Sequence, residues 1–110
     1  MSGNRRRGLN APALLPFEVS NVLRRKWAQG GLALAAAESA LASFAEIPIA
    51  LWPWEALAPT IWNLRGGCTA YDSAYVALAQ LIGAALVTCD KGMVKAAQGR
   101  CPARFLDQRR

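Results

Sequence analysis

The sequence predicts a single α/β domain in which helices cover both sides of a mostly parallel sheet. Three observations support this fold class. The chain has 110 residues, which is the length of one domain. Several stretches repeat apolar residues at helical spacing, and short apolar runs with the length of strands alternate with them. Alternation of this kind is typical of a three-layer α/β/α arrangement.

The first part of the chain predicts a free end, an extended segment and a helix. Residues 1–8 are polar and rich in arginine, and we expect them to be frayed. Residues 9–15 contain Pro12, which has no N–H to donate in a central strand, so we expect an edge-like extended segment. A helix is predicted over residues 17–29, with Glu18 in its first turn. The helix dipole alone explains a negative charge at that position.

The middle of the chain predicts two helices with a strand between them. An alanine-rich helix is expected at residues 32–45, an apolar strand at 49–52 and a helix at 54–64. The helix predicted at 54–64 contains Pro59, which removes one helical hydrogen bond. Tryptophans in this part suit either a core or an interface, with the core slightly favoured. They are Trp52, Trp54 and Trp62.

The stretch from residue 69 onwards organises the rest of the domain. Small and apolar residues at helical spacing predict a helix over residues 69–81, and Gly83 suits the left-handed conformation just past its end. Residues 84–89 form a continuous apolar run, which is typical of a strand buried on both faces. A short helix at 91–98 and a last strand at 104–106 complete the prediction.

Two aspartates stand at comparable positions in this stretch. Asp72 lies in the first turn of its helix, and Asp90 follows the carboxyl end of its strand. Ligands of open α/β sheets bind at the carboxyl ends of the strands. For either residue alone, helix capping is the favoured explanation. Thr69 and Asp72 resemble a capping box, and Asp90 precedes a helix.

Taken together, three acids fall at the starts of helices. If these helices begin at one edge of the sheet, the carboxylates of Glu18, Asp72 and Asp90 converge there. Clustered ionised carboxylates repel each other unless a cation lies between them. Mg²⁺ or Mn²⁺ takes such oxygen ligands and can activate water beside a phosphoryl group. Metal-dependent phosphodiester hydrolysis is therefore one candidate function.

Composition narrows the chemistry. The chain has 13 Lys and Arg against 7 Asp and Glu, a net charge of +6, which fits either a polyanion-binding surface or a solubilising one. It contains no histidine, so His-dependent nucleophilic triads and His-ligated metals are excluded. The three cysteines form no CxxC motif and predict reduced thiols.

No signal peptide or spanning apolar stretch is recognisable, so we expect a cytoplasmic protein without membrane contact.

Two segments and their spacing resemble the PIN domain, most closely the VapC-type toxins of bacterial toxin–antitoxin pairs. They are APALLPFEVSNVLRR and TAYDSAYVALAQLIGAALVTCD. The resemblance covers about residues 9–106 and implies one PIN-like domain over residues 1–110, with residues 1–8 as a basic N-terminus. It further implies an endoribonuclease that uses Mg²⁺ or Mn²⁺, acts on RNA and is held inactive by a cognate antitoxin. Association of two copies of the chain as a homodimer is left open.

The resemblance also assigns roles to individual residues. The helix-borne glutamate of the family matches Glu18, and its two aspartates match Asp72 and Asp90, so these three acids are expected to bind the metal and to be catalytic. Thr88 matches a polar position beside the same pocket.

One part of the family pattern has no match in this chain. The family begins with a central strand that ends in an aspartate, followed by a helix, whereas this chain leads from MSGNRRRGLN directly into the second element. We therefore expect an N-terminally truncated fold with weakened metal binding. Three explanations are open: a reading frame that starts further upstream, a degraded remnant, or a strand donated by a partner. The first two are favoured. The alternative function is an inactive PIN-like protein that acts only through protein association.

Overall fold

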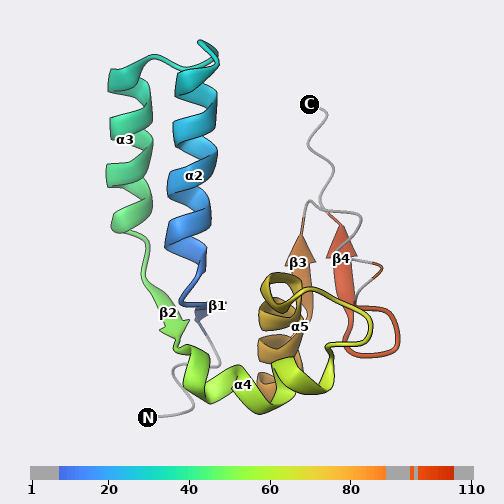
Figure 1. Cartoon of the computed structure of the whole chain (residues 1–110). Coiled ribbons are helices and arrows are strands. Elements are labelled where there is room, and N and C mark those ends of the chain that lie inside the picture. Colours follow the sequence, from blue (N-terminus) through green and yellow to red (C-terminus); the bar gives the residue numbers. More distant parts are fainter. Residues whose placement is uncertain (1–7, 89–94, 96, 106–110) are drawn as a thin grey trace.

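The computed structural model describes residues 8–88, 95 and 97–105 of the chain (Figure 1). Helices and parallel strands confirm the predicted α/β class. In chain order the elements are β1 (Leu9–Pro12), α2 (Leu15–Ala28), α3 (Leu34–Ala45), β2 (Ile49–Trp52), α4 (Trp54–Asn63), α5 (Ala70–Ile82), β3 (Leu86–Thr88) and β4 (Ala103–Phe105).

Helices α2 and α3 form a hairpin that extends away from the rest of the molecule (Figure 1). Pro16 lies in the first turn of α2, where its missing N–H costs nothing, and Gly30 adopts a left-handed φ of 78° in the turn after the helix. Within the hairpin only Ala37 is buried, so most apolar side chains of both helices remain exposed. The two predicted helices are confirmed.

Strands β1 and β2 pair in parallel, with Leu9 opposite Ile49 and Pro12 opposite Trp52. The pair is fixed by a side-chain bond, because the indole N–H of Trp52 donates to the Asn10 side-chain oxygen at 2.9 Å. Just past β1, the N–H of Ala13 donates to the Trp52 carbonyl at 2.8 Å. Among the described residues β1 pairs on one side only, which agrees with the edge-like segment that Pro12 predicts.

The core lies between α4 and α5. Leu57 of α4 and Val76 of α5 are almost completely buried where the two helices pack against each other (Figure 1). The hydroxyl of Thr69 accepts the Asp72 N–H at 3.2 Å at the start of α5, and Gly83 closes its end with a φ of 66°. Both predicted ends of this helix are confirmed. Pro59 lies inside α4, and the helix continues past it to Asn63.

The sheet differs from the expected continuous one. Within the described residues, β1 and β2 form one pair, and β3 and β4 form another, also parallel. Helix α5 contacts both β1 and β3 and so joins the pairs. The strand predicted at 84–89 begins at Leu86 in the structure, and Ala85 before it is exposed. Burial of the strand on both faces stays a prediction. The helix predicted at 91–98 lies largely outside the described residues.

Candidate acidic site between α2 and α5

The acidic site begins with Glu18, which α2 carries in its first turn. Its carboxylate is exposed to solvent, and its Oε1 accepts a hydrogen bond from the hydroxyl of Tyr75 on α5. The two residues are 57 positions apart in the sequence. This bond fixes the start of the helical hairpin against the helix that forms the core.

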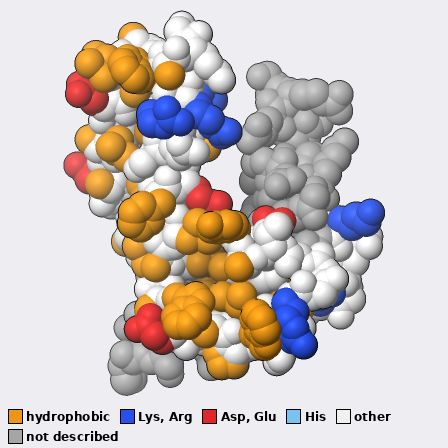
Figure 2. All heavy atoms as spheres, viewed as in Figure 1, with side chains coloured by type: hydrophobic (Ala, Val, Ile, Leu, Met, Phe, Trp, Pro, Cys, Tyr) orange, Lys and Arg blue, Asp and Glu red, His pale blue; other side chains and the backbone are white. Residues whose placement is uncertain are grey.

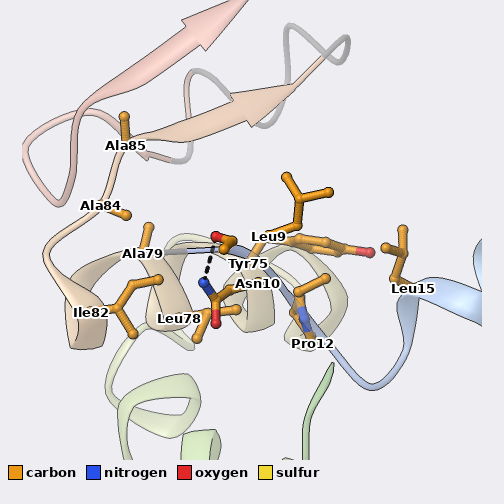
Figure 3. A pocket seen from close by; sticks show the side chains of 12 residues that line it. Leu9, Asn10, Pro12, Leu15, Tyr75, Leu78, Ala79, Ile82, Ala84 and Ala85 are labelled. Carbon is orange, nitrogen blue, oxygen red and sulfur yellow. Dashed lines mark hydrogen bonds between the residues drawn. The ribbon is translucent and has the colours of Figure 1, made fainter. Parts of the chain in front are cut away.

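Tyr75 is half-buried and crosses the space between the two helices. Figure 3 shows its ring pointing from α5 towards Leu15, at the start of α2. Burial raises the pKa of the Tyr75 phenol, and the hydrogen bond to Glu18 and the charge of that carboxylate raise it further. The phenol therefore stays protonated at neutral pH and remains a hydrogen-bond donor to Glu18.

Asp72 lies one helical turn before Tyr75 on α5. Residues three apart on a helix share a face, so the Asp72 side chain starts from the same face that reaches Glu18. Its backbone N–H is used by the Thr69 cap, and its half-exposed carboxylate remains in contact with solvent. Asp72 therefore lies one turn of α5 away from the residue that contacts Glu18.

The two remaining predicted residues belong to the end of β3. Thr88 is the last residue of β3, and β3 contacts α5, which carries Asp72. Asp90 lies outside the described residues, so its predicted place beside the other acids stays a prediction. In the described part of the chain, no group of three acidic, cysteine or histidine side chains is close enough to hold a metal.

The donor types present nonetheless suit a hard divalent ion. Carboxylate oxygens such as those of Glu18 and Asp72 are the ligands that Mg²⁺ and Mn²⁺ prefer, and both side chains are open to water. Mg²⁺ commonly binds through one or two carboxylates and keeps several waters. Two described carboxylates are therefore consistent with such an ion.

Sequence reasoning missed Tyr75 as a member of the site. The available signal was its spacing of three residues from Asp72 along a helix, which places both side chains on one face. A partner 57 residues away has no local signature, so the bond to Glu18 required the structure.

The tryptophans of α4 correct a second expectation. Trp54 is 67% exposed and Trp62 is 66% exposed, so the slightly favoured assignment of both to the core is wrong. Helix α4 is apolar on more than one side, and α5 covers only the side that carries Leu57 and Ile61. Figure 2 shows hydrophobic side chains gathered over α4, with Lys and Arg side chains in separate groups around them.

Comparisons with known proteins were consistent with one another. A family model of the PIN domain matches residues 7–99. VapC ribonuclease Mb0985 of Mycobacterium bovis is 34% identical over 94 residues, which cover 86% of this chain and 74% of that protein. Ribonuclease VapC12 of Mycobacterium tuberculosis is 32% identical over 74% of this chain and 64% of its own length. Ribonuclease VapC3 of the same species is 30% identical over 83% of this chain and 66% of its own length.

Proposed function

Because this chain belongs to the PIN domain family, we propose that it is an endoribonuclease of the VapC type that hydrolyses RNA with the help of Mg²⁺ or Mn²⁺. The observation that supports the proposal is the hydrogen bond from Tyr75 of α5 to Glu18 of α2, because Asp72 lies one helical turn before Tyr75 on the same face of α5. The names of the relatives support ribonuclease activity as the chemistry of this site.

Each acid would have a defined task at this site. Glu18, Asp72 and Asp90 would hold the divalent ion, and Thr88 would contribute a polar side chain beside them. When bound, such an ion activates water and stabilises charge on a phosphoryl group. Tyr75 is a positioning residue, because its hydroxyl orients the Glu18 carboxylate through a hydrogen bond.

The basic end of α2 would help to place the RNA. Arg25 and Lys26 lie in the last turn of this helix, about 10 Å along its axis from Glu18. Cationic side chains at this range contact phosphates and orient a nucleic acid without reading its sequence. RNA would therefore run along α2, with a scissile phosphate at the acidic site.

The proposal includes partners and a compartment. A cognate antitoxin would hold the enzyme inactive, as toxin–antitoxin pairing requires, and two copies of the chain could associate as a homodimer. The expected compartment is the cytoplasm, where RNA is available. No helix in the described part of the chain is long and apolar enough to cross a membrane.

Cleavage of a labelled single-stranded RNA, with and without Mg²⁺, tests the proposal. We expect Asp72→Asn and Asp90→Asn each to abolish Mg²⁺-dependent cleavage, since each removes a negatively charged ligand. Glu55→Gln is the matched control, because Glu55 is an exposed acid on α4, a helix that carries none of the proposed metal ligands, and it should cleave as the unmodified chain does. Unchanged cleavage by either aspartate variant would remove the assignment of that residue.

A second candidate function is association without catalysis. It is favoured by the exposed aromatic side chains of Trp54, Trp62 and Tyr71, each about two-thirds exposed. This function predicts no RNA cleavage by the unmodified protein at any Mg²⁺ or Mn²⁺ concentration. It also predicts concentration-dependent association in sedimentation experiments, which Trp62→Ala would weaken. Cleavage that depends on Asp72 would exclude it.

A further inference from the structure

A small apolar pocket lies where α2, α4 and α5 begin. Its volume is about 190 Å³. The lining includes Leu14 just before α2, Trp54 at the start of α4 and Ala70 at the start of α5. Pockets for drug-sized ligands measure about 300 to 1,000 Å³, so this one has room for little more than a single planar ring system.

Two exposed aromatic side chains stand at this pocket. Trp54 comes from α4 and Tyr71 from α5, and both residues line the pocket although about two-thirds of each is exposed. Leu57, Ile61 and Ala74 also line it and are buried, so they form an apolar floor. Exposed aromatic rings beside an apolar floor are a surface on which another flat ring can stack.

The pocket is next to two residues of the proposed acidic site. Tyr71 immediately precedes Asp72 through a trans peptide bond, so the Cα atoms of the two residues are about 3.8 Å apart. Leu14 immediately precedes α2, whose first turn carries Glu18. An RNA whose phosphate lies at these acids can therefore place a base in the pocket.

We propose that this pocket, here called the base pocket, stacks one base of the RNA substrate against Trp54 and Tyr71. The inference rests on the proposed RNA cleavage and adds to it a contact with a base. Proteins commonly hold single-stranded RNA by stacking its bases on aromatic side chains, and they do so with little regard to sequence because every base has a flat face. The size of the pocket and its place beside Asp72 favour a base over a segment of a protein partner.

Fluorescence anisotropy in EDTA tests the base pocket with two labelled RNAs of about seven nucleotides, a usual site length. One is oligoadenylate, and the other has the same sugar–phosphate chain without bases. EDTA prevents metal-dependent cleavage, so the assay measures binding alone. Stacking of one base on aromatic side chains changes affinity by about 5- to 150-fold. We therefore expect the unmodified chain to bind oligoadenylate at least about fivefold more tightly than the RNA without bases.

Substitutions at the two rings locate the binding. Trp54→Ala should remove most of the preference for oligoadenylate, whereas Trp54→Phe keeps a ring and should retain much of it. Trp62→Ala is the matched control and should keep the full preference, because Trp62 has nearly the same exposure on the same helix and is not among the described residues that line the pocket. Circular dichroism checks that the variants are folded. Tyr71→Ala replaces Trp54→Ala if the latter does not fold.

Three results would overturn the proposal. The first is no preference for oligoadenylate over the RNA without bases, including no binding of either. The second is a preference that survives both Trp54→Ala and Tyr71→Ala. The third is concentration-dependent association of the protein that Trp54→Ala abolishes and oligoadenylate does not compete with, because the pocket would then serve a protein interface.

The result is separable from the test of nuclease activity. A base preference in EDTA without Mg²⁺-dependent cleavage would support the base pocket and contradict the proposed hydrolysis. Cleavage that depends on Asp72, without any base preference, would support the hydrolysis and overturn the base pocket.

Discussion

The hydroxyl of Tyr75 on α5 donates a hydrogen bond to the carboxylate of Glu18 on α2. This bond connects the exposed helical hairpin to the core helix that also carries Asp72. Because the hairpin buries few side chains, a single polar contact has a large share in setting where Glu18 lies relative to Asp72. The geometry of the acidic site therefore depends on a residue that is not itself a proposed metal ligand.

Tyr75→Phe keeps the aromatic ring and removes only the hydroxyl. We expect the free energy of unfolding to fall by about 1 kcal/mol, because one hydrogen bond to a partly exposed carboxylate is lost. The Mg²⁺ concentration that gives half-maximal RNA cleavage should rise several-fold, with little change in the rate at saturating Mg²⁺. Tyr71→Phe, at a 67% exposed position on the same helix, is the control. Equal effects of the two substitutions would contradict the positioning role.

The raised pKa of Tyr75 predicts a loss of stability in alkali. The folded state favours the neutral phenol, so this contribution is complete below the unfolded tyrosine pKa of about 10 and is lost as the pH rises towards the higher folded value. Urea unfolding should show the free energy of unfolding falling more steeply above pH 10 in the unmodified chain than in Tyr75→Phe. If the free energy of unfolding fell equally with pH in the unmodified chain and in Tyr75→Phe, the raised pKa of Tyr75 would not contribute to stability.

Gly83 ends α5 with a left-handed backbone, which places the chain for β3. Gly83→Ala should lower the free energy of unfolding by about 1 kcal/mol, because alanine is strained at this φ of 66°. Apart from its two chain neighbours, no atom of the described residues lies within 4 Å of the position its Cβ would occupy, so the cost is one of backbone conformation. Gly66→Ala is the matched control, since it has equal space and no positive φ. An equal fall in Tm for Gly83→Ala and Gly66→Ala would exclude the conformational explanation.

Local signals in the sequence were sufficient for most of the fold. Thr69 and Gly83 bound α5 as expected, because caps depend on residues within one turn of the helix end. The division of the sheet into two strand pairs could not be predicted as well, because strand pairing joins residues about 40 positions apart, such as Pro12 and Trp52. The exposure of Trp54 was also hidden, because helical periodicity does not say which apolar side a neighbouring helix will cover.

The candidate site was predictable in part. Glu18 and Asp72 were proposed from their helix starts and the family resemblance, and in the structure one hydrogen bond, from Tyr75 to Glu18, connects the helices that carry them. The Tyr75 contact between those elements was not predictable, because it depends on how the hairpin packs against α5. The place of Asp90 lies outside the described residues and stays a prediction.

The central claim is that the acidic site between α2 and α5 binds a divalent ion. Its most direct test is a Mn²⁺ titration of the purified protein, followed by the paramagnetic signal of free Mn²⁺ and by Tm. We predict saturable binding with a rise in Tm for the unmodified chain and for Glu55→Gln, and loss of both in Glu18→Gln and Asp72→Asn. A Tm that does not change with Mn²⁺, or equal Mn²⁺ binding by Asp72→Asn, would contradict the account.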